Sequence, residues 1–134
     1  DISDGTSNTM LFAEWAYGKL RDNDQLEYHW WTGANYGDTM YTTLYPINPS
    51  LNVPNNNFQF AASSYHPGGA NFAFCDGSVK FLKDTIPMNP ADPATGLPAG
   101  ITQANNLYTV TAPLSVYQAL STRNGGETIS ANDY

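Results

Sequence analysis

HPGGANFAFCDGSVKFL, residues 66–82, is the stretch of sequence that decides the fold. Its Asp-Gly pair at positions 76–77 lies between two short runs of alternating apolar and polar residues, the strongest short-range signal for a β-hairpin. A two-residue turn at this pair pairs Phe74 with Val79 and Phe72 with Phe81, so these four side chains share one face of the hairpin. We therefore expect that face to belong to the hydrophobic core.

Two further stretches carry motifs, one near each end of the chain. Residues 2–14 read ISDGTSNTMLFAE, and residues 117–127 read YQALSTRNGGE. Together with the nine residues that separate His66 from Asp76, these segments resemble, in order, the H-x9-D-G family of bacterial prepilin-type proteins, with Ala13 where that family usually has Gly. The resemblance singles out these motif residues, all expected in structural roles: Asp4, Gly5, Thr6, Ser7, Asn8, Thr9, Glu14, His66, Pro67, Gly68, Gly69, Asp76 and Gly77.

The resemblance implies a protein like a pilin or a type II secretion pseudopilin, with a cleavable leader, a hydrophobic helix and a β-rich globular head. No run of 18 apolar residues occurs in this sequence, so it offers no transmembrane segment of its own. We expect residues 1–134 to form the single globular head, while the helix either precedes it in a longer polypeptide or comes from another chain. The expected location is extracellular or at the cell surface. The expected partners are copies of itself in a filament or other pilin-like subunits.

The expected fold class is α+β, mainly β: an antiparallel sheet with the Asp-Gly hairpin, long irregular loops and one short C-terminal helix. A capped helical turn is predicted within residues 4–9, and the helix within residues 112–120, with Pro in its first turn. Strands are predicted at residues 9–15, 27–32 and 58–60, with an edge strand at 127–130. In the first strand, Met10, Phe12 and Glu14 are expected on one side. Residues 33–57 show no period, and we expect residues 35–57 to lie in a subunit contact or to fold over a neighbouring strand.

The composition favours a surface that is polar without being ionic. Charged residues make up 13% of the chain and aromatic residues another 13%, including nine Tyr and three Trp, whereas ordinary domains carry about a quarter charged residues. The net charge of −7, with only five Lys and Arg, disfavours nucleic acid and anionic membranes as partners. Such a surface suits an extracellular protein that contacts copies of itself or sugars.

One segment could hold a cation. Asp22, Asp24 and Glu27 stand at the first, third and sixth positions of a short acidic run, as in a calcium loop, and calcium is the only cofactor that the sequence suggests. The invariant Gly and the distant Glu of an EF-hand are absent, so a solvated turn is the alternative.

Two other functions compete with a structural subunit. The first is a surface carbohydrate-binding module in which Trp15, Trp30 and Trp31 stack on sugars. The second is an enzyme that uses His66 with Asp84 or Glu14.

We do not expect an enzyme, because the sequence lacks the G-x-S-x-G, H-E-x-x-H, Walker and G-x-G-x-x-G motifs. His66 and Asp76 are expected at opposite ends of the hairpin, too far apart for a catalytic pair. Cys75, the only cysteine, is expected to be a small buried apolar residue on the hairpin face opposite the phenylalanines.

Overall fold

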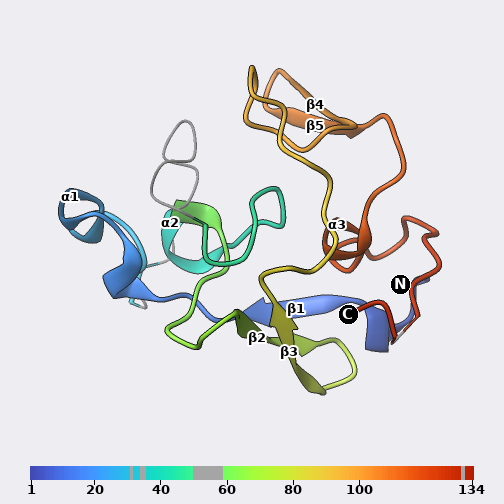
Figure 1. Cartoon of the computed structure of the whole chain (residues 1–134), viewed down its shortest axis with the longest axis horizontal. Coiled ribbons are helices and arrows are strands. Elements are labelled where there is room, and N and C mark those ends of the chain that lie inside the picture. Colours follow the sequence, from blue (N-terminus) through green and yellow to red (C-terminus); the bar gives the residue numbers. More distant parts are fainter. Residues whose placement is uncertain (31, 34–35, 50–58, 131) are drawn as a thin grey trace.

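The structure is a computed structural model that describes residues 1–30, 32–33, 36–49, 59–130 and 132–134. Its centre is an antiparallel sheet of three strands, in the order β1 (Met10–Ala13), β2 (Gly69–Phe74) and β3 (Val79–Lys83). A separate hairpin joins β4 (Ile101–Ala104) to β5 (Leu107–Val110), on the far side of α3 from the sheet in Figure 1. The helices are single turns: η1 (Thr6–Asn8), η2 (Tyr17–Lys19), α1 (Asp22–Gln25), α2 (Tyr36–Thr39) and α3 (Val116–Ala119). The expected class, α+β and mainly β, is confirmed. None of the helices in the described ranges has the length and apolar character needed to cross a membrane.

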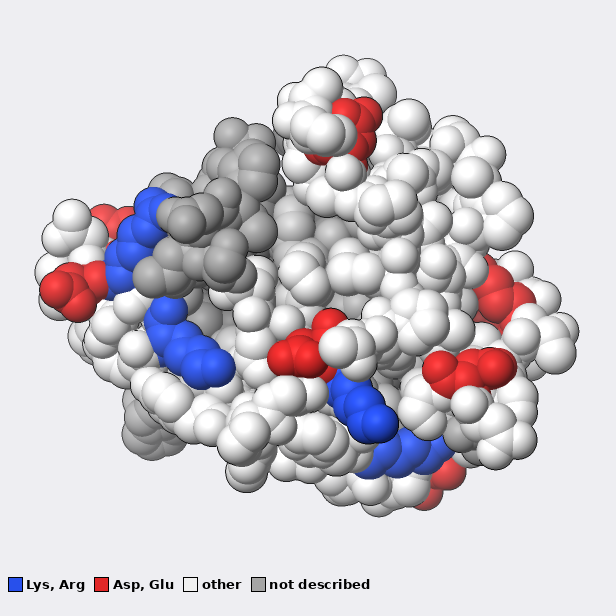
Figure 2. Space-filling view, viewed as in Figure 1, with Lys and Arg blue, Asp and Glu red and all other residues white. Residues whose placement is uncertain are grey.

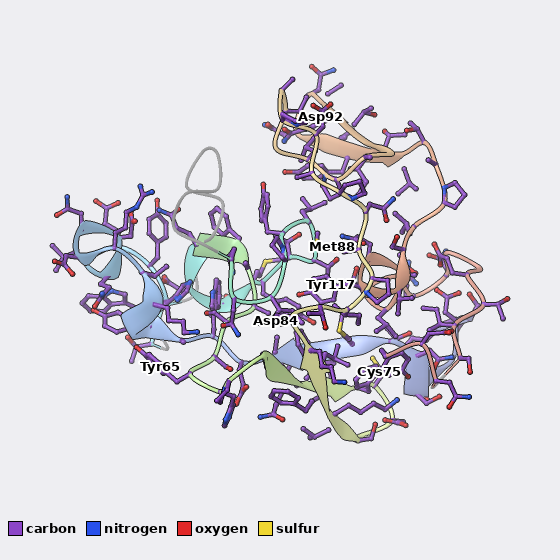
Figure 3. All side chains as sticks on the ribbon, viewed as in Figure 1. Tyr65, Cys75, Asp84, Met88, Asp92 and Tyr117 are labelled. Carbon is purple, nitrogen blue, oxygen red and sulfur yellow. The ribbon has the colours of Figure 1, made fainter. Side chains whose placement is uncertain are left out.

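The core lies between one face of the three-stranded sheet and the segment around α3. Phe72 and Phe74 of β2 are 1% exposed, and Leu82 of β3 is equally buried. The Tyr117 ring on α3 meets the Phe72 ring edge to face, with 6.1 Å between the ring centroids, and Figure 3 shows Tyr117 between α3 and the sheet. Packing of aromatic rings from one helical turn onto the sheet therefore holds the C-terminal segment in place.

The predicted hairpin exists, but its register is shifted by one residue. The loop has three residues rather than two, because the Phe74 N–H donates to the Ser78 carbonyl oxygen and Gly77 adopts a φ of 85°. This is the form in which a type I turn is followed by a glycine bulge. A one-residue slip moves a whole strand to the opposite face. Val79 and Phe81 therefore point away from the core, and their predicted burial with the phenylalanines was wrong.

The first strand carries a second irregularity that the sequence pattern did not reveal. Met10 pairs with Phe74, but Phe12 pairs with Ala73, so an extra residue is accommodated between Met10 and Phe12. Such a bulge changes which side chains face the core. Met10 is buried while Phe12 is 67% exposed, and the prediction that both lie on one side of the strand was wrong.

Three other predicted elements differ from the structure. Residues 27–32 contain no strand among their described members, because the backbone of His29 turns with a φ of 64°. Residues 127–130 are irregular. The predicted helix at 112–120 is reduced to α3, and the N–H of Ser115, just before it, donates to Asn89 Oδ1 at 2.6 Å. Phe58, at the start of the strand predicted for 58–60, lies outside the described residues, while residues 59–60 form no strand.

The described part of the long irregular segment, residues 36–49, folds onto the sheet. The Tyr41 ring packs edge to face against Phe72 with 6.0 Å between centroids, and Ile47 is 2% exposed within the core. For these described residues this matches one of the two roles expected for residues 35–57, of which residues 35 and 50–57 lie outside the described residues. The β4–β5 hairpin was not predicted, although Asn105 and Asn106 both have positive φ at its turn, as a two-residue type I′ turn requires.

Candidate functional site

The Glu14 carboxylate connects the first motif to the second. Glu14 follows β1, and its Oε2 accepts the Asn71 backbone N–H of β2 at 2.7 Å. Oε1 accepts the Asn71 side-chain amide at 3.1 Å and His66 Nε2 at 3.2 Å. The backbones pair in addition, since the Glu14 N–H donates to the Asn71 carbonyl oxygen. Glu14 thus continues the pairing of β1 with β2 by one residue beyond Ala13, because its backbone N–H and its carboxylate both bond to Asn71.

The charge state of Glu14 follows from these bonds. Burial raises the pKa of the Glu14 carboxyl, but the two donors of Asn71 and the nearby His66 more than offset it, so the pKa lies below its ordinary value. Hydrogen bonds to the charged form stabilise that form. Glu14 is therefore an ionised acceptor at neutral pH.

The carboxylate–imidazole pair lies beside a cleft. The cleft, about 280 Å³ in volume, is lined by Glu14, Trp15, Ala16, Ser63, Ser64, Tyr65 and His66. Both serine hydroxyls are already engaged: Ser63 Oγ accepts the Ala16 N–H, and Ser64 Oγ donates to the Gly69 carbonyl oxygen at 2.6 Å. A general base needs a proton to abstract within hydrogen-bonding reach. Within the described residues, the bonds of Glu14 and His66 link the segment after β1 to the segment before β2.

Asp76 does not meet His66. Asp76 is in the hairpin loop, where its Oδ1 accepts both the N–H and the hydroxyl of Ser78, at 2.9 and 2.7 Å. These two bonds lower the pKa of the Asp76 carboxyl. His66 precedes the other end of the hairpin, where Gly69 pairs with Lys83. The structure thus places the two residues at opposite ends, and the carboxylate partner of His66 is Glu14 rather than Asp84.

The Asp4 carboxylate connects the first motif to the third. Asp4 Oδ2 accepts the Gly125 N–H at 2.8 Å and the Thr122 hydroxyl at 3.1 Å, while Oδ1 accepts the Gly126 N–H at 3.0 Å. Desolvation would raise the pKa of the Asp4 carboxyl, but these donors together lower it. The helical turn predicted within residues 4–9 is present as η1, but it has no side-chain cap. We call the bonds of Asp4 to Thr122, Gly125 and Gly126 the terminal clasp.

Two other motif residues, Thr9 and Gly69, interact closely with the backbone of other segments. Thr9 is buried, and its hydroxyl lies within hydrogen-bonding distance of the carbonyls of Gly5 and Thr122. Gly69 has no room for a side chain, because a Cβ there would overlap the Leu82 carbonyl oxygen. The three motifs therefore meet through two carboxylates, Glu14 and Asp4, whose partners sequence spacing could not identify.

The other predicted site residues lie apart from this network. Asp22 and Asp24 are in α1, and Asp24 Oδ1 accepts the side-chain amide of Gln59 at 2.9 Å. Within the described ranges, no three His, Cys, Asp or Glu side chains converge as a metal site would need, so the acidic run is not assembled into one. Cys75 is a half-buried free thiol within the hairpin loop rather than on a strand face.

Sequence reasoning missed one surface that the corrected register creates. Phe12, Ala73 and Val79 lie side by side across β1, β2 and β3 on the face opposite the core, with Phe81 next along β3. Phe12 is 67%, Val79 66% and Phe81 46% exposed. We call these four residues the outer face of the sheet. Its rim is polar, because the His66 ring stands edge-on to Phe81 at 6.2 Å and bonds to Glu14. The alternation of Val79 and Phe81 was visible in the sequence, but it was interpreted as a core pattern.

Comparison with known proteins gives one match. No curated protein and no solved structure matches the chain. The model of the DUF1559 family, described as proteins of unknown function, matches residues 1–89. This range contains the first motif, the whole Asp-Gly hairpin and both partners of the Glu14–His66 pair. Because the match covers well over half of the sequence, the chain belongs to the DUF1559 family.

Proposed function

We propose that this protein is an extracellular, non-catalytic structural subunit of pilin-like type, which associates with copies of itself through the outer face of the sheet. The observation that carries this proposal is the exposure of Phe12, Val79 and Phe81 on neighbouring strands. Single exposed apolar residues are ordinary, but a contiguous group marks an interaction surface. The three ordered motifs and the family match, which hints at a bacterial surface protein, point to the same class.

The energetics of the outer face support burial in an assembly. Full burial of one large apolar side chain contributes about 1.5–3 kcal/mol, so three such side chains from each of two copies provide a substantial driving force. An apolar centre with a polar rim is the usual anatomy of a protein interface, and here the Glu14–His66 pair supplies polar groups at the rim.

The distribution of charge also supports contact between copies. Figure 2 shows a face on which most of the surface belongs to neither acidic nor basic residues, with the charged side chains scattered rather than gathered. With a net charge of −7, an interface between identical chains has to avoid acidic side chains at its centre, and the four residues of the outer face carry none.

The test is self-association of the purified chain, measured by sedimentation velocity over a wide range of concentration and by electron microscopy. We expect concentration-dependent oligomers or ordered polymers. Phe12→Ser and Phe81→Ser should weaken association at least tenfold while leaving the melting temperature almost unchanged, because both side chains are exposed in the single chain.

The matched control is Leu107→Ser, because Leu107 is 70% exposed on β5, outside the outer face. It should leave association unchanged. A chain that stays monomeric at millimolar concentration, or an equal loss in the Leu107 variant, would contradict the proposal.

A further inference from the structure

The fold covers one edge of the central sheet and leaves the other open. At the β1 edge, the Met10 N–H donates to the Leu120 carbonyl oxygen, and the Glu14 carbonyl oxygen accepts the Ser63 N–H. At the β3 edge, no other segment of the described chain makes a comparable pair of backbone bonds. An uncovered edge offers its N–H and C=O groups to a further strand. β3 is therefore the strand at which the sheet can be extended.

The groups that point outward from β3 follow from its pairing with β2. Ser78 and Asp84 both bond to the β2 side through their backbones. Because bonded positions alternate along an antiparallel ladder, Val79, Phe81 and Lys83 direct their backbone N–H and C=O groups away from β2. The Lys83 carbonyl oxygen is used in a local turn, but the outward groups of Val79 and Phe81 have no backbone partner within the described ranges. Alternating donors and acceptors at this spacing are complementary to another extended backbone.

The β4–β5 hairpin has an open edge of the same kind. The Thr111 N–H, just after β5, donates to the Gly100 carbonyl oxygen, so by the same alternation Thr109 bonds to β4 while Tyr108 and Val110 direct their backbone groups outward. Neither residue makes an outward backbone bond to any described segment. No residue of this hairpin is buried, and a two-stranded hairpin is at best marginally stable by itself. A further strand would therefore stabilise it.

The two open edges match in their side chains as well. With β5 of a second copy antiparallel to β3, Tyr108 lies opposite Phe81 and Val110 opposite Val79, and the outward groups of these residues pair. Directly opposed residues share a face of the sheet, and aromatic and β-branched pairs across strands are favourable. In the single chain the four side chains are 46–66% exposed, so all of them have surface to bury in this contact.

The approach to the β3 edge is hollow. A cleft of about 450 Å³ is lined by Phe81 and Lys83 on one side and by residues 132–134 on another. Those C-terminal residues make no backbone bond to β3, so the described part of the chain does not occupy its own edge.

Charge favours β5 over β3 itself as the partner of β3. β3 carries Lys80 and Lys83 and no acidic residue, so pairing β3 with β3 of another copy would bring like charges together, which is destabilising. The β4–β5 hairpin lies within residues 93–122, a stretch without any charged side chain. Between copies that each carry a net charge of −7, contact of a basic edge with an uncharged one avoids repulsion between acidic groups.

We propose that β5 of one copy adds to β3 of the next copy as a fourth strand of its central sheet. This inference rests on the proposed self-association and names the segments that meet. Because the two edges differ, a copy that uses its β3 still offers its β5. The contact therefore repeats head to tail, as it does in rings and filaments, rather than ending at a two-fold dimer.

The first test is amide hydrogen exchange of the full chain, quenched and then read by NMR, at one concentration where it is monomeric and one where it is associated. Association should slow exchange of the Val79, Phe81, Tyr108 and Val110 amides about tenfold or more, because each becomes a donor across the contact. Association without this protection, or protection of the β5 amides alone, would overturn the inference and leave the proposed function standing. Protection already present in the monomer would show that the chain covers its own edges, and would also overturn it. Absence of association would overturn both.

The second test removes one outward donor. Val110→Pro deletes an N–H that the hairpin itself does not use, and proline is tolerated on an edge strand at such a position. Association measured by sedimentation velocity should weaken about tenfold, because backbone groups of the neighbouring strand lose their partner. The matched control, Val110→Thr, keeps the N–H and a branched side chain and should weaken association much less.

Two further variants complete this test. Leu107→Ser should leave association unchanged, because the Leu107 side chain lies on the opposite face from those of Tyr108 and Val110. The melting temperature establishes that each variant is folded, and Val79→Pro with Val79→Thr repeats the comparison on β3 if Val110→Pro is not. Equal association of the proline and threonine variants would show that the backbone of these strands takes no part, and would overturn the inference.

Discussion

Replacing Glu14 by Ala should destabilise the protein far more than replacing its imidazole partner His66. Glu14→Ala removes three hydrogen bonds and leaves the Asn71 backbone N–H without its acceptor at 2.7 Å. An orphaned, partly buried donor costs about 1–3 kcal/mol, and bonds to a charged group contribute more than neutral ones. We therefore expect a loss of about 2–3 kcal/mol. The His66 side chain is 55% exposed, and an ion pair of that exposure contributes only about 0.2–1 kcal/mol.

The assay is urea unfolding followed by tryptophan fluorescence, at a concentration low enough to avoid association. With an m-value of about 1.5 kcal/mol/M, the midpoint should fall by roughly 1.3–2 M in Glu14→Ala and by under about 0.7 M in His66→Ala. Glu14→Gln keeps one carbonyl acceptor for Asn71 and should lie between the two. If His66→Ala costs as much as Glu14→Ala, the imidazole rather than Asn71 is the essential partner, and the reasoning is refuted.

The same carboxylate predicts the direction of a pH effect. The native pKa of Glu14 lies below the ordinary value of 4.5, so its contribution to stability is fully present above that value. It is lost as the pH falls through the lowered native pKa. Subtracting the acid-unfolding profile of Glu14→Gln from that of the unmodified chain should show a difference that shrinks below pH 4.5. A difference that grows toward acid pH would contradict this assignment.

Three further changes follow from the turns and loops. Gly69→Ala should cost about 1–3 kcal/mol, since its Cβ would overlap the Leu82 carbonyl oxygen and overpacking of this kind is destabilising; an unchanged denaturation midpoint would show that the β2–β3 pairing gives way easily. Gly77→Val should cost about 1–2 kcal/mol, because the φ of 85° disfavours a branched side chain, and Gly77→Asn should cost less in the same assay. Millimolar calcium and a chelator should each leave the melting temperature unchanged, because the acids within residues 22–27 are not gathered into a metal site; a clear calcium-dependent rise would restore the sequence-based hypothesis.

The location of the central hairpin could be predicted from the sequence, but its register could not. An Asp-Gly pair fits both a two-residue loop and the three-residue loop with a glycine bulge that the structure has. We chose the two-residue loop on the Asp-Gly pair alone, and the expected burial of Val79 and Phe81 followed from that choice. An alternating apolar pattern predicts which side chains are buried, but it does not say what buries them. Burial against a second copy, as we propose for the outer face, gives the same pattern as burial in the core. Correcting the predicted register is therefore what places Val79 and Phe81 on the outer face of the sheet.

The candidate site could be predicted only as a set of motif residues, without their contacts. Asp4 and Glu14 were recognised within the first motif, but the partners of Asp4 lie 118, 121 and 122 positions away in sequence. No local pattern specifies such pairs. The open edge of β5 was equally hidden, because the β4–β5 hairpin was not predicted. The sugar contacts predicted for Trp15 and Trp30 stay a prediction, and Trp31 lies outside the described residues.

The terminal clasp has a mechanical consequence. The segment that contains Asp4 is bonded directly to residues 122–126, and the Ser3 N–H donates to the Arg123 carbonyl oxygen as well. A tensile force applied between Asp1 and Glu127 would load these bonds before the interior of the sheet, whereas Tyr134 itself stacks on Phe74 of β2 and is bonded to Lys80 of β3. The hydrogen bonds of the terminal clasp would break first. Until they had broken, the hydrogen bonds between β2 and β3 would carry no force. In single-molecule pulling, Asp4→Ala should therefore remove the earliest, low-force rupture while leaving the main unfolding force unchanged.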